Sequence, residues 1–250
     1  MSAENFSWPL HGFAVCQGMP SFIYITDIFC PWCFGFAPVM RRIVQEYAFP
    51  VRVLCGNLVD EPAQTASMGT PRLRAFFQRL SSTTGRSPSD AFFRLLEKEN
   101  SVLMESSRSA VLIAAMKRLA PGNALEQMEK MQEAFYLEGL DVLSLDVQAK
   151  TASRWGVRRE ELEDALLRED VREKARKEMD EAEEILGDFV VYPTLFLKTD
   201  AGMLHAVARG YAPFDAVNEK LREALQEGAV QGSLHGEACG PGEACCIRHS

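Results

Sequence analysis

The sequence predicts an α/β protein in which a small β-sheet is split into two halves by an all-helical domain. Short runs rich in β-branched and aromatic residues, typical of buried strands, occur within residues 22–58 and again after residue 188. Between them, residues 62–187 carry amphipathic segments with helical spacing of their apolar side chains. The predicted order is therefore β-α-β, a block of helices, and then β-β-α.

The first half opens with a strand and a helix. Residues 22–27 read F-I-Y-I-T-D, a run that predicts a buried strand. The segment that follows, up to Tyr47, spaces its apolar residues as a helix does, and Pro31 suits the first helical position, where no N–H is needed. Pro38 is expected to kink this helix. Residues 51–58, V-R-V-L-C-G-N-L, predict a second strand.

The rest of the chain completes the predicted architecture. Strand-like sequence returns at Y-P-T-L-F-L-K-T and M-L-H-A-V-A-R-G, joined by Asp200-Ala201-Gly202, a predicted hairpin turn. A last amphipathic helix follows, and the Gly-rich segment after Gly228 predicts a flexible end. The predicted units are an N-terminal extension (1–20), the first half of the α/β domain (21–61), the helical insert (62–187), the second half (188–228) and a cysteine-containing tail (229–250).

Composition and charge argue against several classes of protein. Of the 250 residues 47% are hydrophobic, enough for a substantial core, and the formal net charge is −8. No global positive field would therefore draw the chain to nucleic acid or to anionic lipid. No stretch reaches the roughly 20 apolar residues of a membrane span, and the N-terminus carries an acid where a signal peptide has positive charge. We expect a cytoplasmic protein that binds neither nucleic acid nor membrane.

Two of the seven cysteines, Cys30 and Cys33, enclose a proline and a tryptophan in the motif C-P-W-C. A structural zinc site needs four ligands, and neither a second C-x-x-C nor a close pair of histidines accompanies this one. A structural disulfide that closes a loop of about four residues would gain little, because the stabilisation grows with loop length. We therefore predict no metal site here and interpret the pair as a redox-active dithiol.

The predicted position of the pair indicates how it reacts. The N-terminus of a helix carries about half a positive charge and unpaired N–H groups, which stabilise a thiolate. Cys30 lies at that end and is expected to be the exposed nucleophile, whereas Cys33, one turn further in, is the resolving thiol. Pro31 and Trp32 are expected to set the redox poise, because one lacks an N–H and the other adds an apolar ring.

Several positions have two interpretations that the sequence leaves open. Asp27, at the end of the first strand, is an N-cap of the helix, a carboxylate that relays protons to the dithiol, or both. Cys16 and Cys55 lie in or beside strand-like sequence and are expected to be buried. The tail thiols are either inert, or exchange with the dithiol, or bind a soft metal ion: Cys239, Cys245 and Cys246.

Longer motifs carry a resemblance to a known family. The opening D-x-x-C-P-W-C at residues 27–33 is followed by E-A-F-Y-L-E-G-L-D-V, A-S-R-W-G-V-R-R-E-E-L and Y-P-T-L-F-L. This pattern resembles the DsbA family of the thioredoxin superfamily, and within it the cytosolic FrnE-like and 2-hydroxychromene-2-carboxylate isomerase-like branch. The resemblance covers about residues 22–225 and implies a thioredoxin fold.

The resemblance also implies site residues. Pro193 corresponds to the family's cis-proline, which faces the dithiol and exposes backbone to a substrate strand. The residue before it is Tyr192, where a smaller aliphatic residue is commoner in the family, so the specificity of this chain is expected to differ. The tail lies outside the family pattern.

The predicted function is a thiol–disulfide oxidoreductase, acting as oxidase, reductase or isomerase on the disulfides of proteins or small molecules. No resident cofactor is expected, and glutathione is a candidate exchange partner. One alternative is a glutathione-dependent isomerase or transferase of the same fold; such relatives typically hold a serine at the position of Cys30 and do not need Cys33. The other is a non-enzymatic adaptor or soft-metal-binding protein.

Overall fold

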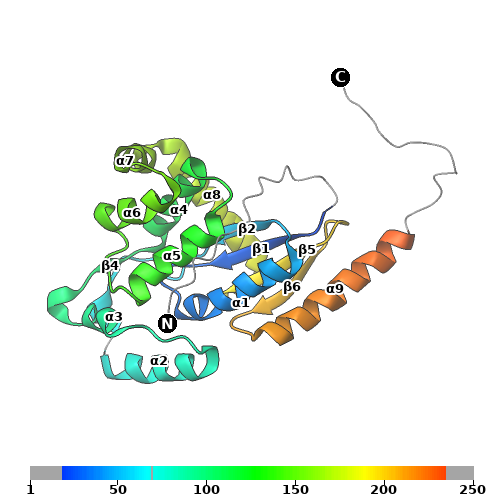
Figure 1. The fold of residues 1–250 in the computed structure, drawn as a ribbon, viewed down its shortest axis with the longest axis horizontal. Coiled ribbons are helices and arrows are strands. Elements are labelled where there is room, and N and C mark those ends of the chain that lie inside the picture. The colour runs from blue at the N-terminus through cyan, green and yellow to red at the C-terminus, as the bar shows by residue number, and fades with distance from the viewer. Residues whose placement is uncertain (1–18, 69, 235–250) are drawn as a thin grey trace.

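The computed structural model describes residues 19–68 and 70–234 and confirms the predicted α/β fold (Figure 1). The main sheet has the strand order β2-β1-β5-β6. Its strands are β1 (Ser21–Thr26), β2 (Val51–Cys55), β5 (Thr194–Lys198) and β6 (Leu204–Arg209). The first two are parallel, as their crossover through a helix requires, and β5 runs antiparallel to both of its neighbours.

Two helices complete the α/β domain that the main sheet forms. Helix α1 (Pro31–Tyr47) connects β1 to β2, and α9 (Phe214–Leu234) follows β6. The β5–β6 hairpin has the predicted turn, in which the N–H of Thr199 donates to the carbonyl of Met203 at 2.9 Å. Gly202 there has a φ of 82°, a left-handed conformation that glycine adopts without strain.

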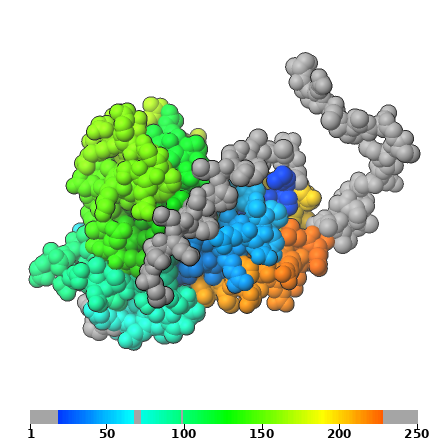
Figure 2. All heavy atoms as spheres, viewed as in Figure 1, coloured from blue at the N-terminus to red at the C-terminus, as the bar shows by residue number. Residues whose placement is uncertain are grey.

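The insert lies to one side of the sheet in Figure 1, between β2 and β5 in the chain. Its α-helices are α2 (Thr70–Thr84), α3 (Asp90–Arg94), α4 (Ser106–Leu119), α5 (Ala124–Tyr136), α6 (Leu145–Ala152), α7 (Arg159–Leu167) and α8 (Glu169–Leu186). Short 3-10 turns occur at Thr65–Met68, Lys98–Asn100 and Ser153–Trp155. In the space-filling view α2, in cyan, lies against the α1 side of the sheet domain (Figure 2).

The insert differs from the prediction in two respects. It is not purely helical, because two short strands within it, β3 (Ala63–Gln64) and β4 (Leu103–Met104), pair antiparallel. Helix α6 also lies outside the segments of residues 62–187 that show clear helical spacing, because it is short and two of its eight residues are β-branched, which weakens the helical signal. None of the described helices is long and apolar enough to span a membrane.

Two element boundaries also differ. Strand β2 ends at Cys55 instead of residue 58, because the N–H groups of Asn57 and Leu58 donate to side chains and not to the backbone of β1, as described below. Helix α9 continues to Leu234, so residues 229–234 are helical and not part of a flexible tail. A single glycine at 228 costs a helix only about 1 kcal/mol relative to alanine, which does not stop it. The rest of the predicted tail lies outside the described residues, as does most of the predicted extension 1–20.

Alternation along β1 divides the core into two layers. Phe22 and Tyr24 belong to the large cluster that includes the buried face of α1 and the aromatic side chains of the insert. Ile23 and Ile25 belong to a smaller cluster on the opposite face, closed by Ala182 and Leu186 of α8. Both cysteines of the C-P-W-C motif are members of this smaller cluster. The start of α1 therefore lies where the sheet domain and α8 meet.

Candidate active site

The dithiol lies at the N-terminus of α1, as predicted. Cys30 is the N-cap residue, with an extended backbone (φ −82°, ψ 113°), and Pro31 begins the helix. The backbone N–H of Cys33 donates to the Cys30 sulfur at 3.3 Å. Both thiols are free in this structure. The helix terminus thus directs a hydrogen-bond donor at one sulfur of the pair.

The exposure predicted for Cys30 is wrong. Only 3% of this residue is exposed, and Cys33 is fully buried. The sequence could not show that Tyr192, far along the chain, lies beside Cys30 in the same buried cluster. Burial, reinforced by the neighbouring Cys30 sulfur, raises the pKa of the Cys33 thiol well above its ordinary value. Cys33 therefore needs a proton acceptor before it can act as a nucleophile.

The loop before β5 covers the dithiol. The Tyr192–Pro193 peptide bond is cis, and the carbonyl oxygen of Tyr192 accepts from the Cys30 thiol at 3.7 Å. The carbonyl of Pro193 accepts from the N–H of Gly210 at 2.7 Å, which ties the loop to the end of β6. The backbone expected from the resemblance to face the dithiol is therefore in contact with Cys30.

The side chain of Tyr192 is held by a notch at the end of β2. Its hydroxyl accepts from the N–H of Asn57 at 3.0 Å. A Cβ added to Gly56 would lie 2.4 Å from the tyrosine ring, closer than real Cβ atoms approach other heavy atoms. Glycine is thus required at 56 by the close approach of the ring. The notch fixes the residue whose carbonyl contacts Cys30.

We expect Gly56→Ala to lower the free energy of unfolding by about 1–3 kcal/mol, because the added methyl overpacks the buried ring of Tyr192. Urea denaturation of both proteins measures the difference. In a Tyr192→Ala background the ring is gone, so the same glycine substitution should cost much less. Equal costs in the two backgrounds would mean that the notch does not hold the ring.

Asp27 is buried behind the dithiol and is not the helix N-cap, since Cys30 occupies that position. Its Oδ1 accepts from the N–H of Phe29 at 2.8 Å. Its Oδ2 accepts from the hydroxyl of Ser106 at 2.7 Å and from the N–H of Leu58 at 3.1 Å. Burial raises the pKa of the Asp27 carboxyl, and these three hydrogen bonds oppose the rise. A buried carboxyl with a raised pKa suits proton exchange.

The protonation of Asp27 predicts a pH dependence of stability. Because its pKa is raised in the folded protein above the ordinary value of 3.8, the folded state binds this proton more tightly than the unfolded state does. The resulting stability is fully present at low pH and is lost as the pH rises through the folded pKa. Asp27→Asn cannot ionise and should lack this loss. Urea denaturation from about pH 3.5 to about pH 7 should therefore favour the variant increasingly, and the opposite trend would contradict the raised pKa.

Trp32 lies between the two halves of the molecule. Its ring is 5.9 Å from that of Phe76 on α2, nearly perpendicular to it, and 6.2 Å from that of Tyr211 after β6. All three rings are partly buried. Phe76 and Tyr211 are site neighbours that sequence reasoning missed, and no local motif marks either of them.

Two further polar residues reach the site from the insert and were also missed. The amide of Gln132 donates to the carbonyl of Asp27 at 3.0 Å, and this glutamine is almost fully buried. The hydroxyl of Tyr136 donates to the carbonyl of Phe29. Only the spacing of Gln132 and Tyr136, which places both on one face of α5, could have suggested a joint role.

The remaining cysteines are not part of the dithiol or lie outside the described residues. Cys55 is buried in β2 as predicted, and burial raises the pKa of its thiol to about 12. Cys16 and the three tail cysteines fall outside the ranges 19–68 and 70–234, so their predicted roles stay predictions. Within those ranges no group of three histidine, cysteine, aspartate or glutamate side chains is placed to hold a metal ion.

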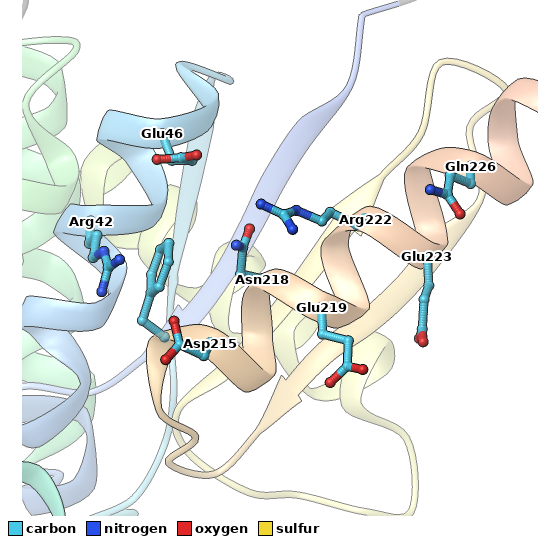
Figure 3. Close-up of a pocket in the computed structure, with 9 residues that line it drawn as sticks. Arg42, Glu46, Asp215, Asn218, Glu219, Arg222, Glu223 and Gln226 are labelled. Atoms are coloured by element: carbon cyan, nitrogen blue, oxygen red, sulfur yellow. The ribbon is translucent and has the colours of Figure 1, made fainter.

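A surface hollow lies elsewhere, between α1 and α9 (Figure 3). It involves the C-terminal half of α1, through Arg42 and Glu46, and not the turn that carries the dithiol. Four carboxylates line it together with two arginines, so negative side chains outnumber positive ones (Figure 3). It shares no residue with the dithiol site.

Comparison with known proteins adds to this geometry. A model of the DSBA-like thioredoxin domain matches residues 23–186. The chain is similar to the structure of a candidate protein disulfide isomerase from Nitrosomonas europaea, with 23% identity, a TM-score of 0.70, and coverage of 84% of this chain and 98% of that one. Among curated proteins none matches the sequence.

The chain is also similar to structures of the cytosolic disulfide reductase DsbM from Pseudomonas aeruginosa. The first has 20% identity and a TM-score of 0.67, and covers 83% of this chain and 99% of that one. The second, with GSH, has 19% identity and a TM-score of 0.66, and covers 82% of this chain and 98% of that one. At these identities the likeness concerns the fold.

Proposed function

The chain belongs to the family of DSBA-like thioredoxin domains, and we propose that it is an enzyme that exchanges disulfides through Cys30 and Cys33. The observation that carries the proposal is the geometry of one sulfur. The Cys30 Sγ accepts from the N–H of Cys33 at 3.3 Å and contacts the carbonyl of Tyr192 at 3.7 Å. A sulfur held between a helix terminus and the cis-proline loop is placed to attack a disulfide that reaches it when the loop gives way to substrate.

The reduction of a substrate proceeds in two balanced steps. The Cys30 thiolate attacks one sulfur of the substrate disulfide, the substrate S–S bond breaks, and the first substrate sulfur leaves as a thiolate that takes up a proton. Cys33 then loses its proton and attacks the Cys30 sulfur of the mixed disulfide. The Cys30–Cys33 disulfide forms, and the second substrate sulfur leaves as a thiolate. Oxidation of a dithiol substrate follows the same steps in reverse.

We propose that Asp27 accepts the proton that Cys33 loses in the second step. Cys33 is buried and its pKa is raised, so it does not ionise readily unaided. The backbone of Asp27 contacts the Cys33 thiol. The Asp27 carboxyl is buried and its pKa is also raised, so that it can hold a proton and give it up during turnover. Pro193 and the carbonyl of Tyr192 supply the backbone against which the substrate lies.

Glutathione is proposed as an exchange partner, with a cytoplasmic location. The support is the fold shared with a cytosolic disulfide reductase, of which one structure is with GSH. In a glutathione cycle, one GSH attacks the Cys30–Cys33 disulfide to form a mixed disulfide. A second GSH resolves it, releasing oxidised glutathione and the reduced dithiol. Each cycle therefore consumes two GSH for one substrate disulfide reduced.

The test is reduction of insulin disulfides by the full chain with glutathione as the electron donor. We expect turnover that requires both Cys30 and Cys33. In a glutathione-dependent isomerase or transferase of the same fold, the isomerase or transferase activity would not require Cys33. An adaptor or metal-binding protein would show no turnover of insulin. Absence of insulin reduction by the wild-type protein, with both glutathione and dithiothreitol as donors, would overturn the proposal for protein disulfides.

A further inference from the structure

The carbonyl of Phe34 lacks its helical partner. In an α-helix this carbonyl would accept from the N–H four residues later. That residue is Pro38, which lies inside α1 and has no N–H. Phe34 itself is fully buried. A buried carbonyl without a donor is destabilising, so another group must supply one.

Arg86 supplies the missing donor. Its Nη1 donates to the carbonyl of Phe34 at 2.9 Å, and its guanidinium carbon lies 4.0 Å from the centre of the Phe34 ring. Its side chain is only 13% exposed. Burial lowers the pKa of Arg86 to about 10, so it stays cationic at neutral pH. One arginine of the insert therefore holds both the backbone and the ring of the residue that follows Cys33.

The end of α2 and its contact with α1 set the position of Arg86. Helix α2 ends at Thr84, whose side chain lies so close to α1 that a Cβ added to Gly35 would be 2.7 Å from it. The Thr84 hydroxyl accepts from the backbone N–H of Arg86 at 3.1 Å, which fixes the turn after the helix. Gly35 thus permits the close approach that places Arg86 against Phe34.

The same guanidinium of Arg86 is also held by helix α5. Its Nη2 donates to Glu133 at 3.0 Å, and its Nη1 lies 3.7 Å from Glu129. Glu129 also pairs with Arg41 of α1. Arg86 therefore connects Phe34 in the first turn of α1 to α5. Glu129 of α5 is in turn connected back to α1 through Arg41. Only the contact with Phe34 reaches the turn that carries the dithiol.

Phe34 connects this contact to the sulfurs. Its N–H donates to the carbonyl of Cys30 at 3.0 Å and closes the first turn of α1, in which the N–H of Cys33 reaches the Cys30 sulfur. A shift of Phe34 would therefore move the donor that stabilises the Cys30 thiolate.

We propose that Arg86 is a positioning residue for the dithiol: it gives the Phe34 carbonyl the hydrogen bond that Pro38 cannot, and so keeps the N–H of Cys33 directed at the Cys30 sulfur. The proposal rests on Cys30 being the attacking thiol of the proposed function. It adds a residue of the insert to the machinery of the site.

The experiment measures alkylation of Cys30 by iodoacetamide across pH, with each cysteine-containing peptide quantified separately by mass spectrometry. Arg86→Met should slow alkylation of Cys30 near neutral pH by about fivefold to tenfold, since a hydrogen bond to a charged group is weakened. Pro38→Ala restores an N–H for Phe34. The double variant should therefore react within about twofold of Pro38→Ala alone, although the ion pair with Glu133 is still missing.

Arg41→Met is the matched control, because it removes a cation from the same network without touching Phe34. It should leave the alkylation rate unchanged while lowering stability. An unchanged rate in Arg86→Met, no recovery on adding Pro38→Ala, or an equal effect of Arg41→Met would each overturn the proposal. If Arg86→Met does not fold, the same comparison is made with Arg86→Lys, which keeps the charge but replaces the two guanidinium nitrogens that bond Phe34 and Glu133 by a single nitrogen on a shorter side chain.

This readout separates the inference from the proposed function. The alkylation rate is a property of the thiol and is measured whether or not the protein turns over any disulfide. If wild-type Cys30 is no more reactive than an ordinary thiol, the proposed function is contradicted, because that function requires Cys30 to be the attacking nucleophile. If wild-type Cys30 is reactive and Arg86→Met is equally so, only the role of Arg86 fails.

Discussion

Replacing Cys30 by serine is expected to reduce the rate of disulfide exchange by at least about a thousandfold, because a hydroxyl does not ionise near neutral pH and provides no comparable nucleophile. The fold should survive the change. The Cys30 sulfur acts as the N-cap acceptor for the N–H of Cys33, and serine is among the residues preferred at that position. Insulin reduction with glutathione as donor measures the loss, and thermal unfolding verifies that the variant is folded.

Cys55→Ser is the matched control for this substitution. Cys55, in β2, is buried like Cys30, with 4% exposed, and takes no part in the dithiol. Its replacement places a hydroxyl in an apolar site and should cost stability, yet it should leave the exchange rate within about threefold of wild type. A comparable loss of rate in both variants would show that Cys30 is not special. Retention of more than about a tenth of the rate in Cys30→Ser would contradict its role as nucleophile.

Replacing Cys33 by serine is expected to trap the mixed disulfide. The resolving attack of Cys33 on Cys30 is intramolecular, at an effective concentration far above that of cellular thiols. Without it an external thiol must resolve the intermediate, so its lifetime should increase by at least about a hundredfold. After addition of oxidised glutathione, mass spectrometry should find the adduct accumulated on Cys30 in this variant and nearly absent in the wild-type protein.

The reciprocal variant provides the control for order. Cys30→Ser should accumulate little adduct on Cys33, because that thiol is fully buried and its pKa is raised. Recovery of equal amounts of adduct from the two variants would mean that the thiols are not ordered as attacking and resolving groups.

The local part of the site could be predicted from the sequence. To place a C-x-x-C motif between a strand and an amphipathic helix, only neighbouring residues have to be considered. The helix begins at Pro31, as predicted. The β-β-α order of the second half likewise follows from two strand-like runs and a turn with Gly202. In each case the deciding interactions lie within a few residues of one another.

The surroundings of the dithiol could not be predicted, because they come from segments far apart in the chain. The exposure of Cys30 depends on Tyr192, 162 residues away, and the acceptor role of Asp27 depends on Ser106, 79 residues away. Arg86 contacts Phe34 only because α2 packs against α1 at Gly35. Nothing in the spacing of these residues indicates that the insert would contribute to the site.

The most direct test of the account is the redox equilibrium of Cys30 and Cys33 with glutathione, read by mass spectrometry of the full chain after rapid acid quenching. The account predicts that the pair interconverts reversibly between two free thiols and one Cys30–Cys33 disulfide as the ratio of reduced to oxidised glutathione is varied. The measured ratio at the midpoint then gives the reduction potential of the couple. If no Cys30–Cys33 disulfide forms at any ratio, or if Cys30 pairs with another cysteine instead, the dithiol is not the exchanging group and the account is contradicted.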